Sequence, residues 1–276
     1  MIMIQLQRQP RTDARKKFRG YKTEKPTGFR KAEVREDSVY QELCGIWTRV
    51  PYFNDVQFSY EACVEAIGSF RCSAEDITKF TINFPEPESS GIVNTIDYQI
   101  KEGVFLTALM NLGNNSDHEL FVGNFHLPPS GIGHLTDRNI IVHGDVWNLL
   151  GSQMRGGSIV VYGNASGCTG QYMKGGKIIV HGNTNSPVGY EMRGGEIEIN
   201  GKAELALGHY MKGGRIIING DYHPVFPIYP AQNMDGGEIH INGNILYVDA
   251  NDLLGKMADW ITKGRFYYQG KLIIDK

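Results

Sequence analysis

The chain of 276 residues has 28 Lys and Arg against 30 Asp and Glu, a formal net charge of −2 at pH 7, and 41% of its residues are hydrophobic. These values exclude a globally cationic nucleic-acid binder and a chain too polar to fold, and no apolar run approaches the ~20 residues that span a bilayer. Glycine is over-represented, at 34 residues or about 12% of the chain, against a usual share of ~7%. We therefore expect most glycines to lie within an ordered structure.

The first 40 residues (1–40) are predicted to form a basic, extended arm. Between Arg8 and Lys31 lie ten Lys or Arg and two acids, a local net charge of +8, so the rest of the chain carries −10. We expect this arm to wrap a partner or to dock on an acidic surface. A nucleic-acid-associated module is a second alternative for the protein, but the arm has few aromatic residues and no recognition motif beside it, so nucleic acid is not the expected partner.

The N-terminus and the cysteines indicate the compartment. Residues 1–8 lack the apolar core and cleavage site of a signal peptide. The four cysteines contain no Cys-x-x-Cys pair and are too sparse for a disulfide framework. The sequence therefore predicts a cytoplasmic protein with no membrane association.

Residues 41–118 are predicted to be a mixed α/β region. Ser59 is expected to cap a helix with an apolar stripe, and Ser73-Ala-Glu-Asp76 has the form of a capping box at the start of a shorter helix. Residues 80–123 are predicted to be mixed strand and loop, ending in Glu119-Leu-Phe-Val-Gly-Asn124 as a degenerate first coil of the repeat that follows.

A 19-residue repeat dominates residues 119–248. The string Met-[Lys/Arg/Asp]-Gly-Gly recurs five times, and a marker glycine, usually followed by Asn or Asp, closes each unit. The residues four and two before that glycine are β-branched in all six units, from Ile140 and Val142 to Ile239 and Ile241. Such period-two alternation predicts one short strand per repeat with one buried face. One strand per 19 residues suits one circuit of a parallel β-solenoid.

The paired glycines of the repeat are predicted to be structural corners. A corner requires positive φ, which glycine adopts cheaply and which Asn tolerates in the Gly-Asn turns. Replacing Gly175 or Gly194 by valine should then destabilise the fold. The methionine before each pair is expected to join a buried column. The ten corner residues are Gly156, Gly157, Gly175, Gly176, Gly194, Gly195, Gly213, Gly214, Gly236 and Gly237.

The repeat resembles a known family. The segment Gly170-Gln-Tyr-Met-Lys-Gly-Gly-Lys-Ile-Ile-Val-His-Gly-Asn183 is similar to the units of the Gly-x-Gly-x-Gly β-helix family. That family includes the C-terminal domain of the glutamate synthase large subunit and one of the subunits of formylmethanofuran dehydrogenase, with its counterpart in the formyltransferase/hydrolase complex. The resemblance covers residues 131–243. It implies a mainly β fold, a right-handed parallel β-helix, and a non-catalytic part that holds catalytic domains or subunits together.

Residues 249–276 are predicted to form an end cap. Asn251 or Asp252 is expected to begin a helix that Gly264 ends, and a strand pair follows that turns at Gln269-Gly270. An uncovered solenoid end exposes unpaired backbone and apolar side chains, so we expect the segments on both sides of the repeat to cover its ends.

One outward-facing column of the repeat is unexpectedly apolar. Three residues before the marker glycine, on the solvent side of each strand, stand Ile141, Val160, Ile179 and Ile217, interrupted by Glu198. A contiguous apolar strip indicates a contact surface. We expect this face to pack against the N-terminal segment or a partner subunit.

The sequence predicts no catalytic, cofactor-binding or metal-binding residues. His143 and His181 share a column but lie two coils, or ~9.6 Å, apart, too far to ligate one zinc ion. No strand-to-helix phosphate loop is present. A carbohydrate-active β-helix enzyme, which would need several carboxylates in a groove, is the first alternative. Glu196 and Glu198, however, alternate with Lys177 and Arg215 and favour a ladder of ion pairs.

The predicted function is therefore structural. We expect a scaffold without activity of its own that organises other protein subunits or copies of itself, as a part of an oxidoreductase or formyl-transfer complex if the resemblance extends to function. No cofactor is expected.

Overall fold

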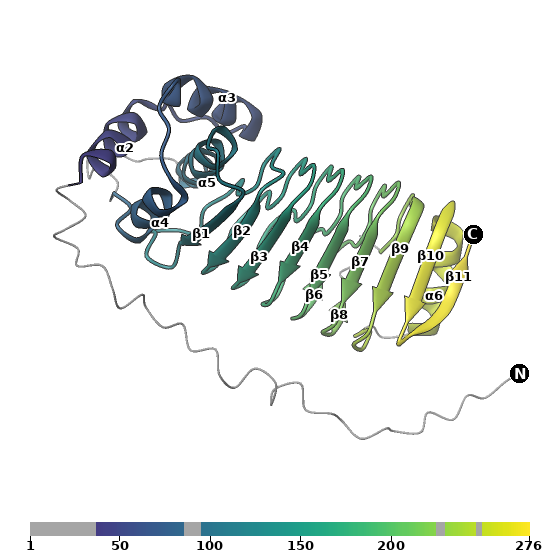
Figure 1. Cartoon of the computed structure of the whole chain (residues 1–276). Helices are drawn as coiled ribbons and strands as arrows, with labels where there is room; N and C mark the ends of the chain where they lie inside the picture. Colours follow the sequence, from purple (N-terminus) through teal and green to yellow (C-terminus); the bar gives the residue numbers. More distant parts are fainter. Residues whose placement is uncertain (1–36, 86–94, 225–229, 247–249) are drawn as a thin grey trace, which may run out of the picture.

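A computed structural model describes residues 37–85, 95–224, 230–246 and 250–276. Its centre is a parallel β-solenoid of about six turns, with helices α2 to α5 at one end and helix α6 with a strand pair at the other (Figure 1). The helices are α2 (Ser38–Arg49), α3 (Val56–Ile67), α4 (Ala74–Ile82), α5 (Thr95–Leu112) and α6 (Ala250–Trp260). The main strands are β1 (Asp117–Phe121), β2 (Asn139–His143), β3 (Ser158–Tyr162), β4 (Lys177–Val180), β5 (Glu196–Ile199), β7 (Arg215–Ile218), β9 (Asp235–Ile241), β10 (Lys263–Tyr268) and β11 (Lys271–Asp275).

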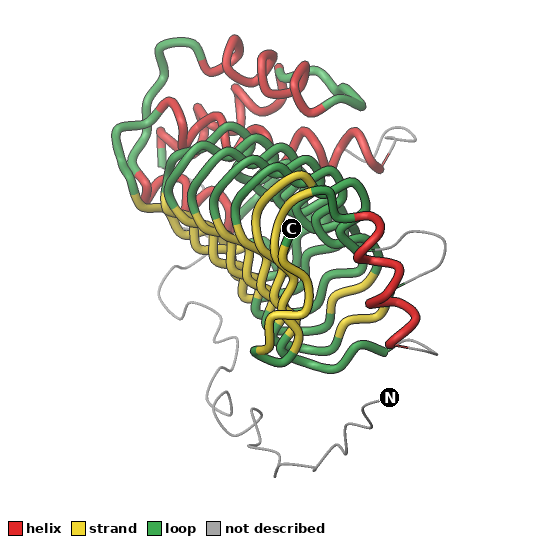
Figure 2. The backbone as a smooth tube through the Cα atoms, turned by 90° about the vertical axis from the view of Figure 1, so that its right-hand side faces the viewer, coloured by secondary structure: helices red, strands yellow, loops and turns green. Residues whose placement is uncertain are grey.

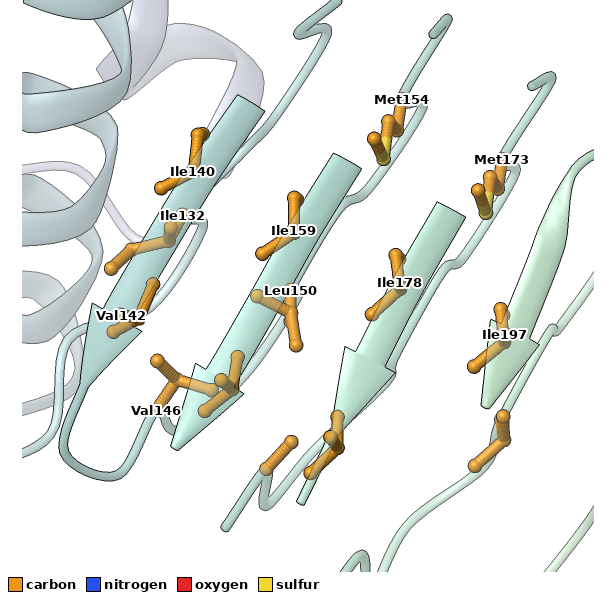
Figure 3. Close-up of a cluster of buried hydrophobic side chains, with 14 of the residues drawn as sticks. Ile132, Ile140, Val142, Val146, Leu150, Met154, Ile159, Met173, Ile178 and Ile197 are labelled. Carbon is orange, nitrogen blue, oxygen red and sulfur yellow. The ribbon is translucent and has the colours of Figure 1, made fainter. Parts of the chain in front are cut away.

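Strands of successive coils stack in the predicted register. They form one nine-stranded sheet in the order β1-β2-β3-β4-β5-β7-β9-β10-β11, parallel except for β11. Ile140 lies opposite Ile159, and Val142 opposite Val161, and the same pairing continues along the solenoid. All twelve β-branched residues of the two predicted columns are at most 1% exposed, and Figure 3 shows several of them pointing into the coil. The prediction of one strand with one buried face per repeat is confirmed.

The interior of each coil is filled by further columns. The methionines of the repeat are completely buried, as predicted, and Met154 and Met173 stack in successive coils (Figure 3). On a second side, isolated bridges connect Val146, Ala165, Thr184 and Ala203 in turn, the last within the two-residue strand β6 (Ala203–Glu204), which pairs with β8 (Tyr222–His223). The tube in Figure 2, viewed from the C-terminal end of the solenoid, shows these coils stacked behind one another.

The corner glycines are explained differently from the prediction. Gly176 and Gly195 have positive φ, of 88° and 90°, but Gly175 and Gly194, which were expected to share it, do not. At Gly175 and Gly194, the first glycine of each pair, a side chain has no room. A Cβ at Gly175 would lie 2.7 Å from the carbonyl oxygen of Arg155 in the preceding coil. The coils stack too closely at this corner for a side chain.

The Gly-Asn turns also differ from expectation. Asn164 and Asn183 do not have positive φ. Their side chains act as acceptors instead: the Asn164 Oδ1 accepts from the backbone N–H of Asn183 at 2.9 Å, and the Asn183 Oδ1 from that of Lys202 at 2.8 Å. Asp145 accepts from the N–H of Asn164 in the same way, at 2.7 Å. Asn and Asp therefore link successive coils.

The N-terminal region is helical, and the prediction of mixed strand and loop over residues 80–123 is wrong for its central part. α5 occupies Thr95–Leu112, and every residue from Lys101 to Met110 is buried. Because α5 is enclosed, it buries Lys101, Glu102 and Thr107 along with its apolar residues, and the sequence shows no amphipathic period. Ser59 lies inside α3, whose N-cap is Asp55, so its predicted capping role is also wrong. The Ser73–Asp76 capping box at α4 is confirmed.

α4 covers the free edge of β1. The hydroxyl of Thr78 donates to the carbonyl oxygen of Glu119 at 2.7 Å, and the backbone N–H of Phe121 donates to the hydroxyl of Thr81 at 3.1 Å. These bonds satisfy backbone groups that would otherwise template another strand. The degenerate first coil is confirmed as β1, which pairs in parallel with β2. The expectation that the N-terminal flank covers one end is thus confirmed.

The C-terminal flank extends the sheet. β10 pairs in parallel with β9, and β11 turns back against it at Gln269 and Gly270, both at positive φ, as predicted for the strand pair. α6 ends at Trp260, and Gly264 lies within β10, so the prediction that Gly264 ends the helix is wrong. The side chains of Asn251 and Asp252 lie outside the described residues.

The predicted boundaries shift slightly. α2 already begins at Ser38, so the helical region starts before residue 41, and β1 begins at Asp117, before residue 119. Residues 1–36 of the predicted arm lie outside the described residues. Within the described part of the chain, no helix combines the length and the apolar character needed to cross a membrane.

Candidate interaction surface on the outer sheet face

The outer face of the sheet carries three parallel columns of side chains, because alternate residues of each strand point away from the core. The middle column contains the predicted strip. Ile141 is 39% exposed, while Val160, Ile179 and Ile217 are half-buried. Their pairing places Ile141 beside Val160 and Val160 beside Ile179, so these three form a continuous line. The predicted outward direction of the strip is confirmed.

A second column, at the end of each strand, is a stack of rings. The rings of Phe121 and His143 lie 4.5 Å apart between centroids, those of His143 and Tyr162 5.4 Å, and those of Tyr162 and His181 4.7 Å, with interplanar angles of at most 19°. The His143 Nε2 also lies 2.7 Å from Glu119 Oε1. Sequence reasoning treated the two histidines as separate groups and missed the stack. The signal was present for three of the rings, since His143, Tyr162 and His181 each occupy the position before a marker glycine.

The ring stack continues as a ladder of amides. Asn200 Nδ2 lies 3.2 Å from His181 Nδ1, and Asn219 Nδ2 donates to Asn200 Oδ1 at 2.8 Å. Asn242 Nδ2 donates in turn to Asn219 Oδ1 at 2.8 Å. The column therefore changes character between β4 and β5, from aromatic rings to amides.

The third column is the predicted ladder of ion pairs. Lys177 Nζ lies 2.8 Å from Glu196 Oε1, and Arg215 lies 3.7 Å from Glu196 and 3.1 Å from Glu238. Arg265 also pairs with Glu238. Hydrogen bonds from His240 and Arg215 and the nearby arginine charges keep the pKa of Glu238 below its ordinary value. The prediction that these acids form charge pairs is confirmed.

The outer face is thus divided into two halves. On β1–β4 the middle and ring columns, apart from Glu119 of β1, make a surface that we call the outer patch: Phe121, Ile141, His143, Val160, Tyr162, Ile179 and His181. On β5–β9 the same columns carry one acid, one histidine and three amides apart from Ile217. Glu198, held 3.2 Å from Lys177 Nζ, marks the boundary.

An open groove of about 660 Å³ runs beside the charged column toward the C-terminal end of the sheet. The glycine corners form its floor, and its walls include Glu196, Arg215, Glu238, Lys263 and Asp275. Glu196 and Glu238 are engaged in the ion pairs above, and Glu238 stays ionised. Glu238 therefore does not supply the protonated acid that glycoside hydrolysis requires.

A buried ionisable pair lies in the helical region. Lys101 is 2% exposed, with its Nζ 4.0 Å from the ring centroid of Trp47 and 4.2 Å from that of Tyr52. Burial lowers the pKa of Lys101 to about 8 and raises that of Glu102 to about 9. The cation–π contacts tie α5 to α2 and the following loop. Sequence reasoning did not find this pair.

The remaining candidate groups supply no reactive centre. Cys168 is half-buried, and burial raises the pKa of its thiol, which disfavours the reactive thiolate. Across the described ranges, no three His, Cys, Asp or Glu side chains are grouped so as to hold a metal ion.

No protein-family model matches the chain, and a search of curated proteins finds no match either.

Proposed function

We propose that the protein is a non-catalytic scaffold whose outer patch binds another protein subunit. The observation that carries the proposal is the division of the outer sheet face: in the middle and ring columns, β1–β4 present aliphatic and aromatic side chains apart from Glu119, whereas β5–β9 present polar side chains apart from Ile217. Protein interfaces have cores enriched in aromatic and depleted of charged residues. The resemblance to β-helix parts of glutamate synthase and formyl-transfer complexes supports the same role, and it makes subunits of such complexes the proposed partners.

The rigidity of the patch supports a scaffold role. Each patch residue stands on a strand whose alternate residues are fully buried, so the backbone beneath the patch is held by the solenoid core. The rings also support one another face to face. Because their faces are already covered by neighbouring rings, they offer edges rather than the open ring faces on which sugars stack. The geometry therefore favours a protein partner over a carbohydrate.

The test compares two substitutions in the same column. Tagged wild-type protein, Ile179→Lys and Ile217→Lys are purified from the native source, and co-purifying proteins are quantified by mass spectrometry. A specific partner should be lost from Ile179→Lys and retained by Ile217→Lys, with unfolding midpoints of both variants close to wild type. Equal recovery of the partner by both variants, or an unchanged oligomeric state where the partner is a second copy, would contradict the proposal.

A further inference from the structure

The two ends of the nine-stranded sheet are finished differently. At β1, the hydroxyls of Thr78 and Thr81 take up backbone groups of the outer edge. At the other end, β11 pairs only with β10 among the described residues. Leu272 and Ile273 on β11 are 48% and 41% exposed. β11 is therefore an open edge with apolar side chains, a feature that natural sheets generally protect.

Backbone groups of β11 are directed to that open side. Gly264 and Lys276 exchange both of their backbone hydrogen bonds, at 2.9 and 3.1 Å, so Lys276 directs its groups toward β10. In an antiparallel ladder such pairs alternate, so Asp275 points its N–H and C=O away from β10. A register shift between Phe266 and Tyr267 leaves Ile273 without a partner on β10.

The irregular register and the charged ends of β11 determine which kind of strand can pair with its open edge. A second β11 from another copy would bring two irregular strands together, each with charged residues at both ends, Lys271 and Asp275. Bulges and edge charges of this kind oppose edge-to-edge association of copies. A short strand with alternating apolar residues and no charged side chains brings neither a second bulge nor further edge charges to the pairing.

The chain contains such a segment outside the described residues. In Met1-Ile-Met-Ile-Gln-Leu-Gln7, the residues Ile2, Ile4 and Leu6 alternate with Met3, Gln5 and Gln7, and the first charged residue is Arg8. This alternation is typical of a half-buried strand. Its aliphatic side can continue the inner surface of β11, where Ile274 is 7% exposed.

The connecting chain is long enough to reach β11. The described structure begins at Asp37, before α2, which lies with α3, α4 and α5 at the β1 end (Figure 1). Crossing the sheet from β1 to β11 takes eight interstrand steps of ~4.8 Å, or ~38 Å. Residues 8–36 can extend to roughly 96 Å, so the same chain can bridge the distance. The charge of +8 on residues 8–31 also suits a path along the rest of the chain, which carries −10.

We propose that residues 2–7 add to β11 of the same chain as a further strand of the sheet. The added strand takes up the free N–H and C=O of Asp275 and covers the exposed edge, as α4 does at β1. It also holds the basic segment 8–31 against the solenoid. This inference is independent of the outer patch, which lies on β1–β4.

Amide hydrogen exchange on the full-length protein tests the proposal. Ile4→Pro removes a donor from the segment, and Lys17→Pro in the connecting chain is the matched control. Exchange of the Asp275 amide should be at least about tenfold faster in Ile4→Pro than in wild type and unchanged in Lys17→Pro. Amides of β3 should exchange alike in all three proteins, which shows that the solenoid is intact. Deleting residues 1–7 should expose the same amide, and a synthetic peptide of residues 1–8 should restore its protection.

Two results would overturn the proposal. Equal exchange of the Asp275 amide in wild type and Ile4→Pro would show that the segment does not cover β11. Protection that appears only as the protein concentration rises, together with dimers in sedimentation velocity, would assign the edge to a second copy.

Discussion

The backbone N–H of Phe121 donates to the hydroxyl of Thr81 at 3.1 Å, and this bond joins the first strand of the solenoid to α4. Replacing Thr81 by valine keeps the shape of the side chain and removes the acceptor, so a buried N–H loses its partner. We expect a loss of about 1–2 kcal/mol in the free energy of unfolding, measured by urea titration. Thr48→Val is the control, because the exposed Thr48 hydroxyl donates to the carbonyl oxygen of Gly45 within α2; an equal effect there would contradict the role of Thr81.

Gly156 and Gly176 occupy two different kinds of corner position, one with room for a side chain and one without. A Cβ on Gly176 would lie 2.6 Å from the carbonyl oxygen of Gly156, at φ 88°, whereas a Cβ on Gly156 would have Asp137 Cβ as its nearest neighbour, at 3.7 Å. Gly176→Ala should destabilise the protein by more than about 1–2 kcal/mol, the strain of positive φ alone. Gly156→Ala should change stability by less than about 0.5 kcal/mol. Thermal unfolding of both variants checks the difference, and similar midpoints would refute this account of the corners.

The methionine column contributes to stability by filling the coil. Met173 is completely buried, and truncation to alanine should leave a cavity that costs about 2–5 kcal/mol. Ile179→Ala, on the outer face of the same coil, should cost less than about 1 kcal/mol because its side chain faces outward. Chemical denaturation measures both; a comparable loss at Ile179 would mean that the outer patch is already covered.

His134 should make stability depend on pH. It is completely buried, and burial lowers its pKa to about 4, below the unfolded value near 6.5. Because the folded state holds the neutral form, the contribution is fully present above pH 6.5 and is lost as the pH falls from 6.5 to about 4. The loss in wild type should reach about 3 kcal/mol at most.

His134→Gln removes that titrating group. The difference in unfolding free energy between wild type and variant should shrink steadily from pH 7 to pH 4, as measured by urea titration at each pH. A difference that stays constant over this range would show that His134 is not held neutral.

The solenoid was predictable because its stacking is local in sequence. Ile140 must meet Ile159 if each circuit takes 19 residues, so the period by itself sets the register, the buried face and the direction of Ile141 and Ile179. The charge ladder of Lys177, Glu196 and Arg215 follows from the same period. In a solenoid, a residue contacts the equivalent residues one repeat before and after it, so the repeat pattern predicts these contacts.

The ring stack could have been predicted from the same period. His143, Tyr162 and His181 occupy equivalent positions, and equal positions in successive coils come within stacking distance. Considered only as metal ligands, His143 and His181 are too far apart to interact, whereas the ring of Tyr162 between them completes the stack.

Other features depended on contacts between segments with no shared period. α5 reads as mixed strand and loop because a helix enclosed by α2, α3, α4 and the first coil buries polar and apolar side chains alike and so shows no amphipathic period. Thr81 meets Phe121 forty residues away, and Lys101 meets Trp47 across two helices. The repeat determined the solenoid and its outer columns, whereas the covering of the β1 edge and the burial of charge required the folded chain, because those contacts join residues that no repeat relates.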